Sequence, residues 1–270
     1  MRIVRFASPS GMFFGVLDGD GQVAQIEGHP FGTISFTGQR YAHADVRLLS
    51  PILPSKVVAV GKNYAAHVAE MGTGDAPKEP LLFLKPSTTV IGPGDAIRIP
   101  PGSTNVHHEV ELAVVIGARG ARHVTPEQAL GSVFGYTIAN DVTERDMQAG
   151  DGQWTRAKGF DSFCPLGPWI ETDLAGLGKD PADLEVTCTV DGELRQSGRT
   201  SQLLFGIPTL VSYISQVMTL LPGDVVLTGT PAGVGPIRPG QRVECAIEGL
   251  GSLVNGVSGA DTASTAGSAR

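Results

Sequence analysis

The chain has 270 residues, of which 41% are hydrophobic and 17% charged, and its formal net charge is -7. This length allows one large domain, or a domain with a smaller companion, and the composition is that of an ordinary folded protein. A negative net charge without a basic stripe argues against nucleic acid as a partner, because binding to phosphates needs clustered lysine and arginine side chains.

The cysteines and the hydropathy pattern bear on the cellular compartment. Cys164, Cys188 and Cys245 show no CxxC spacing, so we expect reduced, buried thiols rather than a disulfide framework or a zinc site. The sequence shows no secretory signal and no apolar run near the length of about 18 residues that a membrane span requires. We therefore expect a cytoplasmic protein without membrane contacts.

The first part of the chain predicts a small β unit. Apolar or alternating runs at residues 2–6, 12–17 and 22–26 favour short strands. The turn signal at residues 18–21 lies between the last two runs and favours a hairpin. The 36 glycines and 19 prolines of the whole chain favour many turns and short strands over a helical bundle.

A predicted buried strand at residues 56–61 runs into a segment of helical composition at residues 62–70, for which Asn63 is a candidate N-cap. His67 and Glu70 would share one face of that helix. A carboxylate on one imidazole nitrogen makes the other nitrogen a better base. Such a pair is more often a surface ion pair than a catalytic dyad, and at this point both interpretations stay open.

The most informative stretch is residues 106–117, which predicts one continuous β-strand. Its apolar residues alternate on one face, while Glu109 and Glu111 fall together on the other face. Neighbouring carboxylates repel each other unless they meet bulk water, a cation or a shared proton. A second predicted strand, residues 136–141, ends on a third acid, Asp141.

These three acids are either surface residues or one metal site. The strands around them are strongly apolar, which makes a solvent-facing arrangement less favourable. An all-oxygen ligand set suits Mg²⁺ or Mn²⁺ better than zinc. Adjacent strand residues point to opposite faces, so of His107 and His108 only His107 could join the acids. Basic residues follow at Arg145, Arg156 and Lys158, either as surface ion pairs or with Lys158 pointing into the acid site.

The remaining regular elements are expected to be structural. Thr125 and Gln128 form a capping box at the start of a short helix, and residues 184–193 predict a hairpin. Leu210, Ile214, Val217 and Leu221 have helical spacing, and Pro222-Gly223 would end that helix.

A predicted strand at residues 224–227 runs into a glycine-rich loop at residues 228–235. The loop lacks both common nucleotide-binding spacings, so it does not predict a nucleotide site. Its backbone N–H groups and Thr230 could still bind a carboxylate.

Six motifs, in order over about residues 55 to 250, resemble the fumarylacetoacetate hydrolase (FAH) family. They are Gly61-Lys62-Asn63-Tyr64-Ala65-Ala66-His67 with Glu70, Phe83-Leu84-Lys85-Pro86, His107-His108-Glu109-Val110-Glu111-Leu112, and the stretches 135–143, 154–161 and 227–235.

The resemblance implies a mixed α/β, mainly β fold. An FAH-type β-roll catalytic domain would occupy residues 53–256, behind a small N-terminal β domain at residues 1–52, and the chain would form a homodimer. Residues 257–270 are rich in Ala, Ser, Gly and Thr, which is typical of a disordered tail.

The resemblance also implies roles for individual residues. Mg²⁺ or Mn²⁺ would bind Glu109, Glu111 and Asp141. His67, oriented by Glu70 beside a mobile lid at residues 71–79, would be the base, and Lys158 would face a developing oxyanion or enolate. Gln148 and Thr230 would contact the substrate carboxylate.

The expected protein is a metal-dependent enzyme that acts on small 2-oxo or enol di-acids through a metal-bound enolate. Isomerisation or decarboxylation of aromatic ring-cleavage products of the 2-hydroxyhepta-2,4-diene-1,7-dioate type, or decarboxylation of oxaloacetate, is favoured. One alternative is a hydrolase that cleaves C–C bonds in acylpyruvates or fumarylacetoacetate-type substrates. A catalytically idle protein that binds small acids is the alternative from another class.

Overall fold

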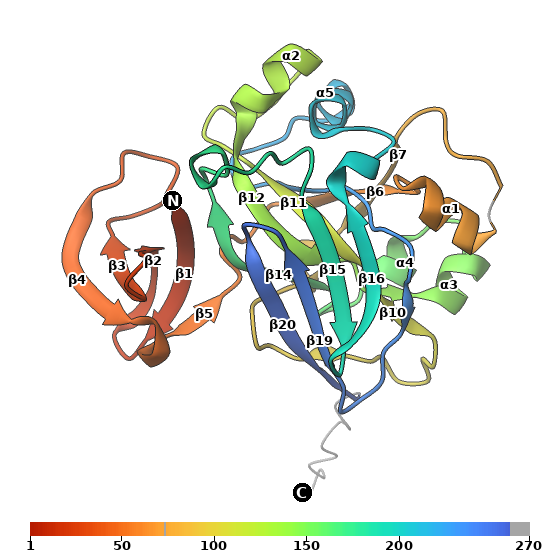
Figure 1. The fold of residues 1–270 in the computed structure, drawn as a ribbon, viewed down its shortest axis with the longest axis horizontal. Coiled ribbons are helices and arrows are strands. Elements are labelled where there is room, and N and C mark those ends of the chain that lie inside the picture. Colours follow the sequence, from red (N-terminus) through yellow and green to blue (C-terminus); the bar gives the residue numbers. More distant parts are fainter. Residues whose placement is uncertain (73, 260–270) are drawn as a thin grey trace, which may run out of the picture.

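The computed structural model describes residues 1–72 and 74–259 (Figure 1). Residue 73, in the predicted lid, and residues 260–270, in the predicted tail, lie outside the described residues. Strand β20 continues through Ser258, so the first residues assigned to the tail belong to a strand.

The N-terminal unit is a small antiparallel sheet at one end of the molecule, drawn in red and orange in Figure 1. Its strands are β1 (Arg2–Ser8), β2 (Gly11–Leu17), β3 (Gln22–Ile26), β4 (Phe36–Ala42) and β5 (Arg47–Leu49). The expected hairpin between β2 and β3 is present. Strand β4 was not predicted, because five of its seven residues are exposed and it carries no apolar alternation.

A twelve-stranded sheet runs through both parts of the chain, because β1 pairs with β14. Beyond β1 its strands follow in the order β14 (Cys164–Glu171), β12 (Val133–Asn140), β11 (Val110–Ile116), β17 (Val225–Leu227), β6 (Val57–Gly61) and β7 (Leu81–Lys85), with β8 (Val90–Ile91) on β14. A five-stranded sheet contains β16 (Glu193–Arg199), β15 (Glu185–Val190), β19 (Arg242–Ile247), β20 (Gly251–Ser258) and β9 (Ile97–Arg98). A three-stranded sheet contains β13 (Thr143–Glu144), β10 (Val106–His108) and β18 (Gly235–Pro236).

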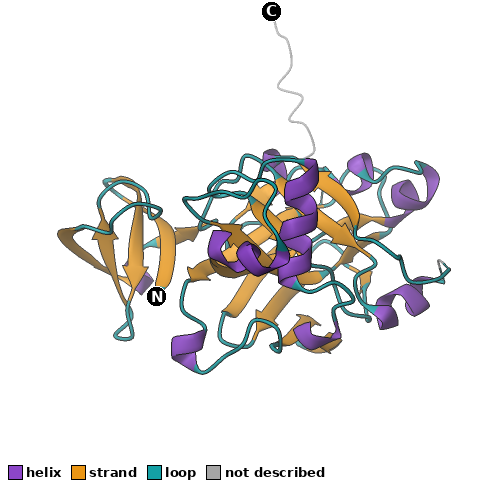
Figure 2. Ribbon diagram, turned by 90° about the horizontal axis from the view of Figure 1, so that it is seen from above, coloured by secondary structure: helices purple, strands orange, loops and turns teal. Residues whose placement is uncertain are grey.

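The helices are short and lie around the strands (Figure 2). The α-helices are α1 (Ala65–Met71), α2 (Pro126–Ala129), α3 (Arg145–Gly150), α4 (Thr155–Lys158) and α5 (Ile207–Val217). Short 3-10 turns occupy His43–Asp45, Ser87–Thr89, Leu130–Ser132, Ala175–Leu177 and Thr200–Gln202. The main core lies where β11 and β12 pack on the five-stranded sheet, so the mixed, mainly β fold is confirmed.

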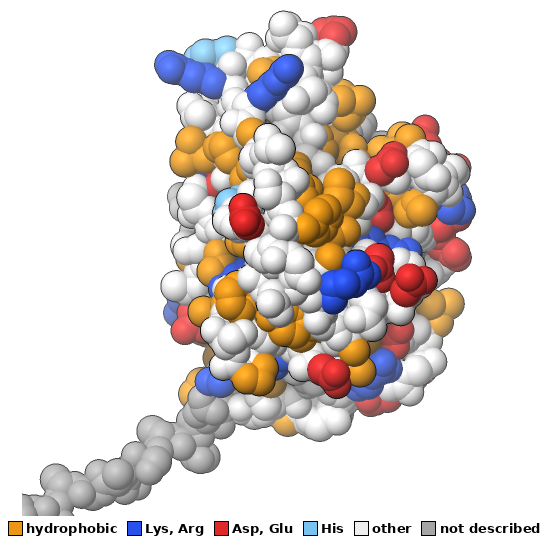
Figure 3. Space-filling model, turned by 90° about the vertical axis from the view of Figure 1, so that its left-hand side faces the viewer, with side chains coloured by type: hydrophobic (Ala, Val, Ile, Leu, Met, Phe, Trp, Pro, Cys, Tyr) orange, Lys and Arg blue, Asp and Glu red, His pale blue; other side chains and the backbone are white. Residues whose placement is uncertain are grey.

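The surface and the helices add two observations. On the face shown in Figure 3, Lys and Arg side chains lie apart from one another among acidic and apolar ones, and they form no continuous basic band there. Of the helices in the described ranges, none combines the length and the apolar character needed to cross a membrane.

Three local predictions were wrong. Residues 106–117 do not form one strand: the chain breaks at Glu109, and β10 and β11 belong to different sheets. Helix α5 ends at Val217 rather than at Pro222, and Val217 is 64% exposed, because the buried stripe starts earlier, at Ile207. Asn63 does not cap α1, since its side chain bonds the backbone of Phe205 and the carbonyl of Thr228 instead. The capping box of Thr125 and Gln128 is confirmed.

Candidate metal centre and active site

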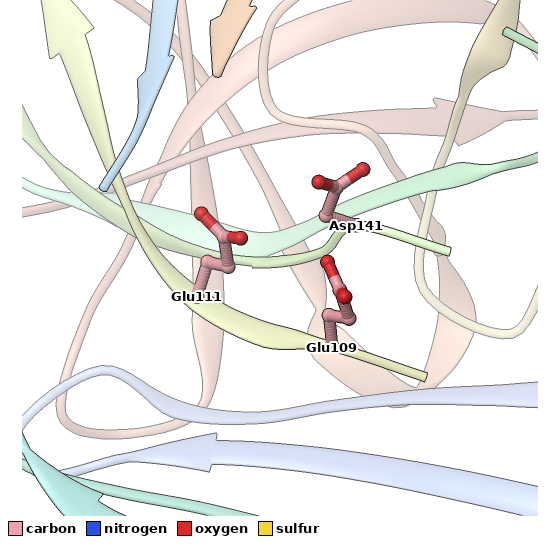
Figure 4. A group of neighbouring side chains, drawn as sticks. All are labelled: Glu109, Glu111 and Asp141. Carbon is pink, nitrogen blue, oxygen red and sulfur yellow. The ribbon is translucent and has the colours of Figure 1, made fainter. Parts of the chain in front are cut away.

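Three buried acids converge where β11 and β12 meet (Figure 4). Glu109 stands at the break before β11, Glu111 lies on β11, and Asp141 directly follows β12. The antiparallel register places Asp141 beside Glu109, and the N–H of Asp141 donates to the carbonyl of Glu109 at 2.8 Å. One carboxylate oxygen from each acid lies within 4.8 Å of the others, and none of the residues is more than 3% exposed. The three acids therefore form a possible metal-binding triad rather than a surface patch.

Buried cations reach into this cluster from three other elements. The Nζ atom of Lys158 lies 2.7 Å from Oε2 of Glu109 and 2.6 Å from Oδ2 of Asp141. Lys85 Nζ lies 2.6 Å from Oδ1 of Asp141, and Arg145 Nη2 lies 2.5 Å from Oε1 of Glu109. Lys158 thus points into the acid site, whereas Arg156 pairs with Asp151 on the surface.

The electrostatic environment shifts the pKa values of Glu109 and Glu111 in opposite directions. Burial alone would raise the pKa of Glu109, but the charges of Lys158 and Arg145 hold it well below its usual range. Burial raises the pKa of Glu111 well above its usual range, and the charges of Asp141 and Glu109 add to this effect. Glu111 accepts a hydrogen bond from the N–H of Gly229 at 2.6 Å but forms no ion pair in the described part of the chain. Glu111 is therefore the carboxylate that most needs an added cation.

Lys158 keeps its charge in this environment. Burial alone would lower the pKa of its ammonium group, but the neighbouring carboxylates of Asp141 and Glu109 outweigh burial and raise it. The ammonium group also lies 5.0 Å from the ring centroid of Phe83, within the range of a cation–π contact.

Helix α1 brings the predicted dyad to the same place. Nδ1 of His67 lies 3.2 Å from Oε2 of Glu70, and His67 is buried while Glu70 is about one third exposed. The N–H of Gly233 donates to Oε1 of Glu70 at 3.0 Å, so the glycine-rich loop holds the carboxylate from behind. The His67–Glu70 pair is thus held in place by a backbone hydrogen bond and by burial of His67, and it is not an isolated surface ion pair.

A cavity of about 580 Å³ opens above the acids. Of the eight site residues expected from the sequence, seven line it: His67, Glu109, Glu111, Asp141, Gln148, Lys158 and Thr230; Glu70 lies behind His67. His107 also lines it, as its strand position predicted, but its Nε2 bonds Asn105 at 2.9 Å and it does not join the acid group.

The outer wall of the cavity is aromatic. The rings of Phe83 and Trp154 meet edge to face with centroids 5.3 Å apart. A Cβ atom on Gly61 would lie 2.4 Å from Trp154, so only glycine allows this ring position without a shift. The cavity therefore joins a polar floor of acids and cations to an apolar rim.

Two residues of this site were not assigned from the sequence. Lys85 ends an apolar strand, and a single charge in that position was the available signal. Arg145 belongs to the basic group found in the sequence, but only Lys158 of that group was predicted to point into the acid site. Arg145 bonds Glu109 and also donates to Oε1 of Gln148 at 2.7 Å, so it fixes the orientation of the Gln148 amide.

The fold and the buried acid triad define a mainly β protein with a candidate metal centre in a deep cavity. A family model described as "Fumarylacetoacetate (FAA) hydrolase C-terminal" matches residues 56–258, and one described as "Rv2993c-like, N-terminal" matches residues 1–51. The chain belongs to the fumarylacetoacetate hydrolase family, as its motifs indicated, and it is an enzyme.

Individual relatives cover most of the chain. "Protein Rv2993c" of Mycobacterium tuberculosis is 56% identical, with 95% of this chain and 98% of the relative aligned. A mitochondrial oxaloacetate decarboxylase of Dictyostelium discoideum is 47% identical over 72% of this chain and 89% of its own. The crystal structure of a 5-carboxymethyl-2-hydroxymuconate delta-isomerase from Mycobacterium smegmatis has a TM-score of 0.89 and 53% identity, and covers 96% of this chain and 100% of that one.

Proposed function

We propose that the chain is a Mg²⁺- or Mn²⁺-dependent enzyme that isomerises or decarboxylates small 2-oxo or enol di-acids. The observation that carries the proposal is the buried triad of Glu109, Glu111 and Asp141, in which Glu111 forms no ion pair within the described residues. Three oxygen ligands of this kind suit a hard divalent cation and leave positions for water and substrate.

The local charges support a dianionic substrate. When all three carboxylates are ionised, the charges of Lys85, Arg145 and Lys158 match them, so the residues of the cluster together are close to neutral. A divalent cation would give the cluster a net charge near two positive units, which a di-acid would neutralise. When bound, the cation would polarise the 2-oxo group of the substrate and favour formation of an enolate.

The side chains around the triad supply the remaining functions. Lys158 is positioned to stabilise negative charge that develops on substrate oxygens, because its ammonium group is buried and faces the cavity. Gln148 would contact a substrate carboxylate through its amide nitrogen, since Arg145 occupies its Oε1 atom. His67, with Nδ1 held by Glu70, would move protons at Nε2.

The names of relatives agree with this substrate class. One solved relative is named an isomerase of a hydroxymuconate and one curated relative an oxaloacetate decarboxylase. Both reactions pass through the enol or enolate of a 2-oxo acid. We therefore place ring-cleavage products of the 2-hydroxyhepta-2,4-diene-1,7-dioate type and oxaloacetate first among the substrates.

C–C bond hydrolysis of acylpyruvates or fumarylacetoacetate-type substrates is the second candidate. It is favoured by the His67–Glu70 contact, since a base held by a carboxylate is what activation of a water nucleophile needs. Decarboxylation needs no water nucleophile, so the same dyad would then only manage protons.

We also propose that the chain is a cytoplasmic homodimer. Strand β7 ends the twelve-stranded sheet, and its Leu81 and Leu84 are 40% and 46% exposed. Exposed apolar side chains on an edge strand favour association with another chain. Light scattering should give twice the chain mass of 28.1 kDa, and cell fractionation tests the location.

A substrate panel tests the proposed function. Oxaloacetate, 2-hydroxyhepta-2,4-diene-1,7-dioate and acetylpyruvate are each incubated with chelator-treated protein, with and without added Mg²⁺ or Mn²⁺. We expect metal-dependent turnover of at least one of the first two. Full activity after chelation would contradict the metal requirement, turnover of acetylpyruvate alone would favour the hydrolase, and no turnover at all would favour an idle acid-binding protein.

A further inference from the structure

Gln196 on β16 is fully buried, and its side-chain amide joins two parts of the site. None of the functions proposed above uses this residue. Its Oε1 accepts from the N–H of Val110 at 3.1 Å and lies 2.9 Å from Nδ1 of His108. Its Nε2 donates to Oγ1 of Thr230 at 2.7 Å and to the carbonyl of Pro231 at 2.8 Å. One side chain therefore ties the residues on either side of Glu109 to the glycine-rich loop.

The orientation of this amide follows from its partners. The N–H of Val110 can only donate and the carbonyl of Pro231 can only accept, so the oxygen of Gln196 must face Val110 and its nitrogen must face Pro231. In the flipped amide, the NH2 group would face the N–H donor of Val110, and the amide oxygen would face the carbonyl acceptor of Pro231. Gln196 is thus a donor to the hydroxyl of Thr230 and cannot be an acceptor for it.

This orientation settles where the proton of Thr230 goes. A threonine hydroxyl has one proton and two lone pairs. One lone pair accepts from Gln196, and the proton donates to the carbonyl of Val110 at 2.8 Å. Thr230 lines the cavity, so any hydrogen bond between its hydroxyl and a bound ligand must be one that the hydroxyl accepts. A substrate carboxylate also needs a donor, so it is the wrong partner for this hydroxyl.

We propose that Gln196 is a positioning residue that fixes the Thr230 hydroxyl as an acceptor for the enol hydroxyl of a bound ligand. This inference rests on the proposed function, because a 2-oxo acid gains such a proton when it enolises. It replaces the expected contact between the Thr230 hydroxyl and the substrate carboxylate. It also gives the site a means to prefer an enol over its keto form, since only the enol offers the proton.

The first test compares two buried amides. Gln196→Met keeps the length of the side chain but removes all four hydrogen bonds. Asn255→Leu is the matched control: Asn255 is 2% exposed on β20 and donates to the carbonyls of Gly92 and Asp95, none of which lines the cavity. Both variants should unfold at a lower temperature. Only Gln196→Met should raise KM for the best substrate, by about tenfold, with kcat changed by less than about threefold.

The second test asks whether Gln196 acts through Thr230. Thr230→Val removes the acceptor and should raise KM by a similar factor. The double variant Gln196→Met/Thr230→Val should raise it no further than the larger single effect. Inhibition by oxalate, a dianion with two adjacent carboxylates and no enol proton, should change by less than about twofold in all three. Where Gln196→Met does not fold, Gln196→Glu carries the same test, since it keeps the acceptors and removes the donor.

The outcomes separate this inference from the proposed function. If the wild type is active and Gln196→Met leaves KM unchanged, the proposed role of Gln196 is wrong but the proposed function stands. The same conclusion follows if the KM effects of the two substitutions multiply in the double variant. Equal weakening of oxalate and of the enol-forming substrate overturns the acceptor role of Thr230. Wild-type protein that neither turns over a 2-oxo acid nor binds oxalate in the presence of Mn²⁺ overturns both proposals.

Discussion

Lys85 and Asp141 form a fully buried ion pair, with Nζ 2.6 Å from Oδ1 and neither residue more than 1% exposed. The other oxygen of Asp141 is held by Lys158 at 2.6 Å. Both oxygens of this candidate ligand are thus oriented by the protein before any metal binds. Positioning by such surrounding partners is what holds carboxylate ligands ready for a cation.

Lys85→Met should destabilise the metal-free protein by about 3–5 kcal/mol, because it leaves a buried carboxylate short of one charge partner. Added Mn²⁺ should recover part of that loss, since a cation on Asp141 replaces the missing charge. Chemical unfolding with and without Mn²⁺ measures both effects. Lys56→Met is the control, because Lys56 pairs with buried Asp224 away from the cavity. Equal Mn²⁺ recovery in both variants would contradict a role for Lys85 at the metal site.

Asp141→Ala should abolish metal-dependent turnover while the circular dichroism spectrum stays that of the wild type. The physical reason is that the triad loses one of its three oxygen ligands and Lys158 loses one of its two carboxylate partners. Mn²⁺ binding by calorimetry should weaken in step with activity. Glu171→Gln is the control, since Glu171 is a buried acid of the same sheet that pairs with the N-terminus instead. Wild-type activity of chelator-treated Asp141→Ala protein would rule out the metal mechanism.

The sequence predicted the acids of this site better than their partners. Glu109 and Glu111 were found because a strand places alternate residues on one face, and Asp141 because it ends the neighbouring strand. Lys85 was missed because it lies 56 residues from Asp141, and no local pattern connects positions so far apart. Gln196 was missed for the same reason, since its partners lie more than 30 residues away in either direction.

The fold shows the same division between local and long-range information. Hairpins and the capping box of Thr125 were predicted because turn chemistry and caps act over a few residues. The break at Glu109 was not, because it depends on β10 and β11 joining different sheets. That break matters for the site, because it falls on Glu109 itself, one of the two glutamates of the triad.

Arg145→Met should raise KM by at least about tenfold, because Arg145 holds both Glu109 and the amide of Gln148. Steady-state kinetics on the best substrate measures the change. Arg156→Met is the control, since Arg156 is an exposed arginine that pairs with Asp151, five residues earlier in the chain. Equal kinetic constants for the two variants would show that Arg145 is as dispensable for the reaction as a surface ion pair.

His67→Ala separates the two candidate reactions, because they ask different things of the dyad. If His67 activates water, hydrolysis of acetylpyruvate should fall by a factor on the order of 10²–10⁴. Loss of CO₂ from oxaloacetate needs no water nucleophile, so it should fall far less in the same variant. Parallel assays of both substrates with one preparation of protein measure the ratio.

Glu70→Gln refines this test, because an amide whose oxygen takes the place of Oε2 can still accept from Nδ1 of His67 and from the N–H of Gly233 but carries no charge. If Glu70 only orients the ring, Glu70→Gln should retain most of the hydrolysis that His67→Ala loses. If its charge is needed to stabilise the imidazolium that forms when His67 takes up a proton, hydrolysis in Glu70→Gln should fall toward the rate of His67→Ala. An unchanged rate of acetylpyruvate hydrolysis in His67→Ala would show that His67 is not the base.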